Sequence, residues 1–189
     1  NLQLLREGKA DLGFVQGGTL DANAEVDPTL QSLGSLFLEP VWLFYRDNGK
    51  TGKALTSLTQ LQGLRVNIGT AGSGVPSLMA KLLESNHVEL QSVKTSTLEQ
   101  TPATMAFLAG ELDAIVFASA PESLMVQMLL QTPGVRLMDF AQSEAYARRF
   151  AFLSPAVLPR GVVDLAANIP PQDVHLVAPT TTLLTRVGT

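Results

Sequence analysis

Cysteine is absent from this 189-residue sequence, and histidine occurs only twice. The lack of cysteine excludes disulfide bonds, thiolate chemistry and cysteine-ligated zinc. His87 follows a polar helix end and His175 lies in an apolar strand pattern, so the two are too far apart for metal-ligand spacing. The sequence therefore predicts no metal site, no cofactor and no catalytic residues.

Long hydrophobic runs and clusters of basic residues are also missing. No segment approaches the roughly 18 consecutive apolar residues that a membrane-spanning helix needs. The 13 basic and 17 acidic residues give a net charge of −4 and are spread along the chain, so nucleic acid is not an expected partner. Hydrophobic residues make up 46% of the sequence, which is enough for a sizeable core and one or two domains.

Strand and helix patterns alternate regularly from Leu64 onward, which argues for parallel βαβ units and an α/β fold. Before this region, a short helix ends at Gly8, and afterwards two extended segments surround a polar turn. The expected strands are 11–15, 35–38, 41–45, 64–68, 90–93, 112–117 and 135–138, followed by extended segments at 150–163 and 174–187. The expected helices are 75–85, 101–109, 121–131 and 142–149, and 47–53 is expected to be a polar loop.

A glycine-rich turn, Gly69-Thr-Ala-Gly-Ser-Gly74, connects one of these strands to the following helix. Its spacing resembles a P-loop, but Val75 and Pro76 occupy the positions where a P-loop needs Lys and Ser/Thr. A dinucleotide-binding fingerprint fails because Ser77 replaces its third glycine. A nucleophile elbow fails because Ala71 and Val75 replace its two glycines.

Although none of these three motifs is present, the turn still offers backbone N–H groups at the start of a helix, where the helix dipole favours an anion. The Ser73 hydroxyl either binds that anion or caps the helix, because serine is a favoured N-cap residue. If the hydroxyl only caps the helix, the turn is simply a tight connection between strand and helix.

Four segments, taken in order, resemble the TAXI family of TRAP-transporter extracytoplasmic receptors. Asn1–Gln16 resembles the "Gly, Ala-Asp, strand, Gln" signature of periplasmic solute-binding proteins, and Leu36–Pro40 resembles the strand that follows it. Leu61–Gly74 resembles the family segment that ends in Gly-Ser-Gly, and Leu108–Ala114 matches its "Gly-x-x-Asp-Ala" motif. The resemblance covers nearly the whole chain.

This resemblance implies a two-lobe, type II periplasmic-binding-protein fold, with residues 1–45 in lobe I, 46–173 as lobe II and 174–189 returning to lobe I. The family's opening strand and closing helices are not in this sequence, so we expect lobe I to be truncated at both ends. We also expect its exposed strand edge to pair with a second copy.

The implied function is that of a periplasmic or otherwise extracytoplasmic receptor, not an enzyme, with any membrane tether in segments outside this sequence. It would bind a glutamate-like amino acid or a dicarboxylate and deliver it to the membrane subunits of a TRAP transporter. The resemblance places the carboxylate at the glycine turn, an ammonium group at Glu39 and a pocket wall at Phe37. The expected ligand-binding residues are Gln16, Gly17, Phe37, Glu39, Gly72, Ser73, Gly74, Val75, Ala118, Ser119 and Pro121.

Two alternatives remain open for this fold. One is the ligand-sensing effector domain of a LysR-type transcription regulator, and the other is an enzyme on the same scaffold, such as one acting on thiamin-pyrimidine precursors. The enzyme would need a catalytic His or Cys set that the sequence does not display. A signal peptide upstream would favour the receptor, and a helix-turn-helix would favour the regulator.

Overall fold

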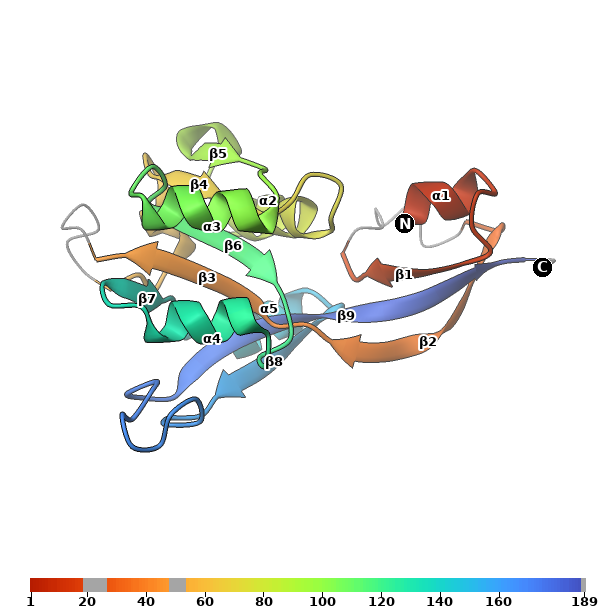
Figure 1. The fold of residues 1–189 in the computed structure, drawn as a ribbon. Helices are drawn as coiled ribbons and strands as arrows, with labels where there is room; N and C mark the ends of the chain where they lie inside the picture. The colour runs from red at the N-terminus through yellow and green to blue at the C-terminus, as the bar shows by residue number, and fades with distance from the viewer. Residues whose placement is uncertain (19–26, 48–53, 188–189) are drawn as a thin grey trace.

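A computed structural model describes residues 1–18, 27–47 and 54–187 and contains two β-sheets, the smaller of which has one long strand that extends into the larger unit (Figure 1). The predicted polar loop at 47–53 lies almost entirely outside the described residues. The helices are α1 (Leu2–Arg6), α2 (Val75–Ser85), α3 (Gln100–Leu108), α4 (Leu124–Gln131) and α5 (Ser143–Arg149), with 3₁₀ helices at Leu58–Leu61 and Leu90–Ser92. The strands are β1 (Leu12–Gln16), β2 (Leu30–Leu38), β3 (Val41–Arg46), β4 (Arg65–Asn67), β5 (Lys94–Ser96), β6 (Ala114–Ala118), β7 (Val135–Leu137), β8 (Leu153–Leu158) and β9 (Val174–Arg186).

The larger sheet has the strand order β5-β4-β6-β3-β7. Strand β4 runs parallel to β5 and β6, whereas β3 runs antiparallel to both β6 and β7. The four strands that follow Leu64, β4 to β7, are therefore parallel to one another, as the alternating pattern predicted for this region. The sheet is mixed because β3, which precedes that region, runs antiparallel between β6 and β7.

Strand β3 shows why this sheet is covered on both faces. Val41, Leu43 and Tyr45 join the hydrophobic core beneath α2, while Trp42 and Phe44 join the core beneath α3 and α4. All five side chains are at most 3% exposed. A continuous apolar run of this kind is typical of a central strand that is buried on both sides.

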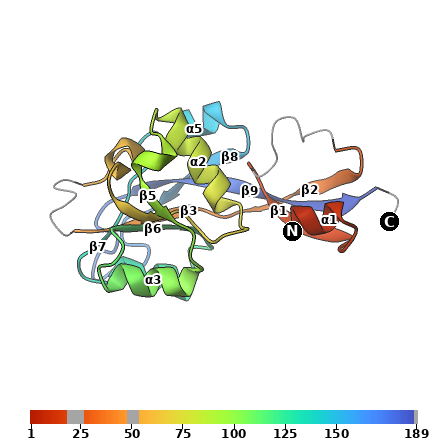
Figure 2. The ribbon, with the colours of Figure 1, turned by 90° about the horizontal axis from the view of Figure 1, so that it is seen from above.

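The smaller sheet has the order β1-β9-β2, and β9 links it to the larger unit (Figures 1 and 2). Residues 174–179 of β9 pair with β8, and residues 180–186 pair with β1 on one side and β2 on the other. Helix α1 covers one face of this sheet, where Leu5 packs with Val15 and Leu184. The first half of β9 also packs into the cores of the larger unit through Leu176 and Val177, so this strand connects the two units.

The predicted lobe boundary between residues 45 and 46 falls at the end of β3, and it stays a prediction. Val41 already lies opposite Ala118 in the larger sheet. The chain therefore passes from the smaller sheet to the larger one at Glu39–Pro40. Strand β9 belongs to the smaller sheet along its whole length, because it pairs first with β8 and then, from Thr180, with β2 and β1.

Two predicted elements are displaced in the structure. The strand predicted at 90–93 is wrong, because Leu90–Ser92 forms a 3₁₀ helix and the strand beside β4 is the polar segment Lys94–Ser96. The helix predicted from 121 begins instead at Leu124. It starts there because the Ser123 hydroxyl accepts a hydrogen bond from Val126 N at 3.3 Å, as an N-cap residue does.

Candidate functional site

A cleft of about 700 Å³ lies between the glycine turn before α2 and the β1-β9-β2 sheet. Its two walls therefore come from different sheets of the molecule. The larger unit contributes Ala71, Gly72, Ser73, Gly74 and Ser77. The smaller unit contributes Asn1, Leu2, Gln3, Phe14, Val15, Gln16, Phe37, Glu39 and Thr181.

The glycine turn is tight because two of its residues have positive φ angles that disfavour L side chains. Gly69 has φ +111°, and a Cβ placed there would lie 2.6 Å from the Val75 Cβ. Gly72 has φ +78°, with open space where its Cβ would be. The turn is closed by a hydrogen bond from Ser73 N to Thr70 O at 3.1 Å. Glycine at these positions lets the backbone reverse directly in front of α2.

The Ser73 hydroxyl contributes to the turn in the structure. It donates a hydrogen bond to Thr70 O at 2.7 Å and accepts a long one from Val75 N at 3.4 Å. Within the described part of the chain, the N–H groups of Gly74 and Ser77 have no hydrogen-bond acceptor. Both capping and anion binding are therefore compatible with this turn, because its backbone donors supply the positive end of the α2 dipole.

The turn is anchored to the neighbouring loop by the end of β4. Asn67, 2% exposed, accepts hydrogen bonds from Leu98 N at 2.7 Å and Ser96 Oγ at 2.9 Å. Ala71 N in turn donates to Thr97 O at 3.1 Å. These contacts place the N–H groups of the turn at a carboxyl end of the sheet, where open α/β folds bind ligands.

The opposite wall is a row of three residues across the smaller sheet. Gln16 on β1 and Phe37 on β2 both lie opposite Thr181 on β9. The Phe37 ring packs against Phe14 with a centroid separation of 5.8 Å. Glu39 is half-buried and carries the only charged side chain among the described residues that line the cleft. This wall therefore combines an aromatic surface with one carboxylate.

Six of the predicted site residues line this cleft, and two others lie just outside it. Val75 does not line it, because its side chain is only 5% exposed and belongs to the core beneath α2. Gly17 is held against the crossing of β9, where its N–H donates to Thr180 O at 2.6 Å and its α-carbon lies close to Phe152. The six residues that line the cleft are Gln16, Phe37, Glu39, Gly72, Ser73 and Gly74.

The second predicted turn lies at the chain crossing and does not line the cleft. Ser119 N donates a hydrogen bond to Pro40 O at 3.3 Å, and Trp42 Nε1 donates to Ser119 O at 2.9 Å. Ala118 is paired with Val41 in the larger sheet. Ala118, Ser119 and Pro121 are therefore not among the residues that line the cleft, and their ligand contacts stay predictions.

The sequence reasoning missed several residues that line the cleft. Phe14 was detectable, because it is two residues before Gln16 and side chains alternate between the faces of a strand. Ser77 was also detectable, because it lies in the first turn of a helix whose start was predicted. Thr181 had no local signal, since its position depends on how β9 pairs with β1 and β2.

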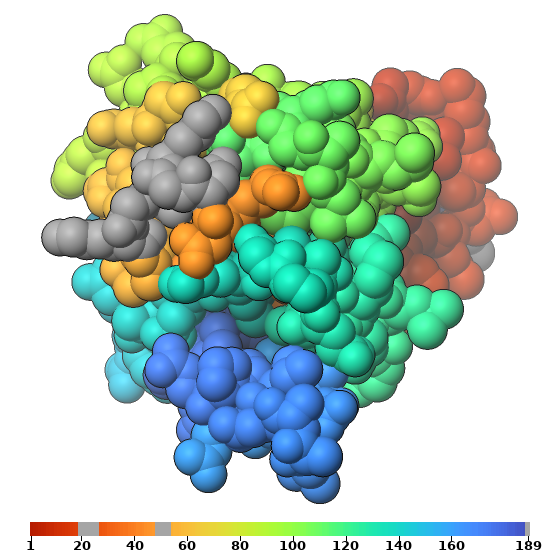
Figure 3. Space-filling view, turned by 60° about the vertical axis from the view of Figure 1, so that its left-hand side comes forward, coloured from red at the N-terminus to blue at the C-terminus, as the bar shows by residue number. Residues whose placement is uncertain are grey.

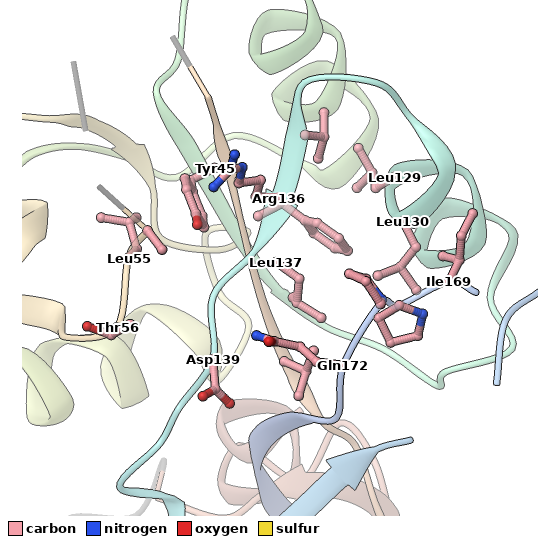
Figure 4. A pocket seen from close by; sticks show the side chains of 16 residues that line it. Tyr45, Leu55, Thr56, Leu129, Leu130, Arg136, Leu137, Asp139, Ile169 and Gln172 are labelled. Carbon is pink, nitrogen blue, oxygen red and sulfur yellow. The ribbon is translucent and has the colours of Figure 1, made fainter. Parts of the chain in front are cut away.

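A second hollow of about 460 Å³ lies at the outer edge of the larger sheet, around β7 (Figure 4). Leu129, Leu130 and Leu137 contribute to its largely apolar lining. Figure 3 faces this side of the molecule, with the teal α4 and β7 region above the blue segment 160–173. Arg136 at this hollow is ion-paired with Asp47 at 2.5 Å.

The described residues form neither a metal-binding group nor a helix that could span a membrane. Within residues 1–18, 27–47 and 54–187, no three His, Asp or Glu side chains come together as a metal-binding group. The described helices are all too short or too polar to cross a bilayer.

Two α/β units joined by a long strand, with a cleft between them, define the class of type II periplasmic-binding-protein folds. The family model described as "NMT1-like family" matches residues 1–187, so the chain belongs to the NMT1-like family. A comparison with curated protein sequences gives no match.

Solved structures with this fold include both transport proteins and regulators. The amino acid ABC transporter substrate-binding protein AbpA from Streptococcus pneumoniae, bound to L-arginine, has a TM-score of 0.55 and 16% identity, and the match covers 100% of this chain and 60% of AbpA. The effector-binding domain of QuiR in complex with shikimate has a TM-score of 0.58 and 11% identity, with 100% of this chain and 68% of that domain covered.

The aliphatic sulphonate-binding protein SsuA from Escherichia coli has a TM-score of 0.52 and 21% identity, and the match covers 78% of this chain and 52% of SsuA. The chain thus spans little more than half the length of the two transport proteins. At these identities the similarity establishes the fold and not the ligand.

Proposed function

We propose that the protein is an extracytoplasmic solute receptor that binds a small carboxylate in the cleft and delivers it to a TRAP-type membrane transporter. The main support is the arrangement of the cleft, in which Ser73 and Gly74 face Gln16, Phe37 and Glu39 across about 700 Å³. Ligand pockets of proteins commonly have volumes of roughly 300–1,000 Å³. The resemblance to TAXI receptors supplies the transporter class and the periplasmic location.

The charges around the cleft favour an amino acid over a dicarboxylate. The backbone N–H groups of the glycine turn and the α2 dipole attract one carboxylate group. Glu39, the only charged side chain among the described lining residues, attracts an ammonium group and repels a second carboxylate. A glutamate-like amino acid therefore fits this charge pattern better than succinate does, because both have two carboxylates but only the amino acid has an ammonium group to pair with Glu39.

The proposed mechanism is binding without covalent chemistry. A ligand that contacts both walls stabilises the closed arrangement of the two units, because those contacts are complete only when the units are together. The membrane subunits would then recognise the closed receptor. The degree of closure is set by the difference in affinity of the ligand for the closed and open states.

The turn is tested by Ser73→Asp, with Ser73→Asn as its matched control. Both substitutes are good helix caps and similar in size, but only aspartate adds a negative charge where the ligand carboxylate binds. We expect Ser73→Asp to weaken L-glutamate binding at least tenfold and Ser73→Asn to weaken it much less, measured by titration calorimetry on the full-length protein. Val75→Asp is unsuitable, because Val75 is in the core and the charge would unfold the turn. Equal affinities of the two Ser73 variants would contradict the proposal.

The ammonium site is tested by Glu39→Gln. We expect this change to weaken L-glutamate binding and to leave succinate binding unchanged or stronger, because it removes a negative charge and keeps the side-chain shape. If both ligands lose affinity equally, Glu39 does not recognise an ammonium group.

A second candidate function is that of a regulator's effector domain. The whole chain aligns with the effector-binding domain of QuiR, and the same cleft would then bind a signalling metabolite. The two functions differ in the segment that precedes residue 1 in the full-length protein. A signal peptide there supports the receptor, and a helix-turn-helix supports the regulator.

A further inference from the structure

Thr181 is an unusual residue in the cleft wall because its hydroxyl is buried without a hydrogen-bond partner. The residue is 4% exposed, and no group in the described part of the chain lies within hydrogen-bonding distance of Thr181 Oγ1. It nevertheless lines the cleft, between Gln16 on β1 and Phe37 on β2. A buried polar group without a partner destabilises the folded protein, so this threonine requires an explanation.

The backbone around Thr181 is held firmly by both units of the molecule. Gly17 N donates to Thr180 O at 2.6 Å, and Thr180 N donates to Phe152 O at 3.0 Å. Glu39 N donates to Pro179 O at 3.3 Å. Thr181 therefore has a fixed position just where β9 enters the smaller sheet. A group on such a rigid element is well suited to orient a ligand.

Rotation about χ1 of threonine exchanges its hydroxyl and methyl groups between staggered positions. Contact with a ligand would require the Thr181 hydroxyl, on a residue that lines the cleft, to face the cleft in one of these positions. A bound molecule with a carboxylate or ammonium group would then provide the hydrogen-bond partner that the free protein does not. Valine would have the same shape but would not form this bond.

We infer that Thr181 is a ligand-contacting residue whose hydroxyl hydrogen-bonds to a polar group of the bound amino acid. The inference rests on the proposed function, in that the ligand occupies this cleft. It adds a contact from β9, the strand between β1 and β2, to the two predicted contacts Gln16 and Phe37. Together the three residues form one continuous row across β1, β9 and β2.

The test compares Thr181→Val and Thr181→Ser with the control Thr182→Val. Thr182 is the next residue on β9 but lies opposite Val15 and Ser35, with its hydroxyl 3.4 Å from Ser35 Oγ. Calorimetry measures L-glutamate binding to the full-length protein, and thermal unfolding measures stability without ligand.

We expect Thr181→Val to weaken L-glutamate binding about tenfold, as the loss of one hydrogen bond does. Thr181→Ser and Thr182→Val should remain within about threefold of the unmodified protein, because a change of about 0.65 kcal/mol corresponds to that ratio. Without ligand, Thr181→Val should raise the melting temperature by about 2–4 °C, because it removes a buried hydroxyl that has no partner.

The outcomes separate the inference from the proposed function. If the unmodified protein binds L-glutamate and Thr181→Val binds it equally well, the inference is overturned and the proposed function stands. If the unmodified protein binds neither L-glutamate nor succinate, the proposed function fails and the inference falls with it. A Thr181→Val variant that is less stable without ligand would also overturn the inference, because the hydroxyl would then have a structural partner.

Discussion

The glycine turn allows a sharp comparison between two of its own residues, Gly69→Ala and Gly72→Ala. Both glycines have positive φ angles, +111° and +78°, so each alanine would be strained by its backbone. Only at Gly69 would the new Cβ also collide, at 2.6 Å from the Val75 Cβ. Gly72 has open space at the same point. The two variants thus share the strain and differ in the collision.

The expected losses in the free energy of unfolding follow from these two terms. A left-handed conformation costs an L-residue about 1–2 kcal/mol, and overpacking in a dense core costs about 1–3 kcal/mol. Gly72→Ala should therefore lose about 1–2 kcal/mol, and Gly69→Ala about 2–5 kcal/mol. The effect of alanine on the unfolded chain is similar in both and cancels in the comparison.

Urea unfolding monitored by fluorescence measures this difference directly. The chain has a single tryptophan, Trp42, which is completely buried in the core of the larger sheet and should report its unfolding. If the two variants have the same midpoint and slope, the contact between Gly69 and Val75 does not constrain the turn. That result would refute the packing account of why glycine is needed there.

Two further predictions concern residues that support the larger sheet. Asp113 is 2% exposed, and its carboxylate accepts hydrogen bonds from Arg65 N and from the Arg65 guanidinium, whose pKa it raises. Asp113→Ala should therefore lower the free energy of unfolding, measured in urea, by about 2–3 kcal/mol. A loss below about 0.5 kcal/mol would contradict this. Burial raises the pKa of Tyr146, whose hydroxyl accepts a hydrogen bond from Asn86 at 2.7 Å. The folded state thus favours the protonated phenol. The contribution of Tyr146 to the free energy of unfolding should be fully present below about pH 10 and should decline as the pH rises further. Tyr146→Phe should make this alkaline decline shallower in urea midpoints measured across that range, and an unchanged slope would contradict the assignment.

The parts of the structure that the sequence predicts well are governed by local rules. Helix α2 runs from Val75 to Ser85 as expected, because the glycine turn and Pro76 set its start and the apolar periodicity carries it forward. The position of Ser73 and Gly74 in the cleft follows from the same local rules. A turn between strand and helix needs no knowledge of distant residues.

The parts that were displaced depend on pairing between distant segments. Strand β5 was expected at 90–93 because Val88, Leu90 and Val93 are apolar, but β5 is an edge strand and its residues Lys94–Ser96 are polar. The apolar run of β3 matches any buried strand, and only its pairing with β6 assigns it to the larger sheet. A sequence pattern indicates that a strand is buried but does not name its neighbours.

The residues of the cleft likewise differ in whether the local sequence or the pairing of distant strands places them there. The residues on its turn side were singled out from the glycine spacing, and Gln16, Phe37 and Glu39 on its other side were singled out from the resemblance to a receptor family. Thr181 completes the row only because β9 places it opposite both Gln16 and Phe37. A shift of one residue in that register would turn Thr181 to the α1 side and bring Thr182 to the cleft. Which of two adjacent threonines can contact a ligand is therefore decided by the pairing of β9, and the comparison of Thr181→Val with Thr182→Val tests that register as well as the contact.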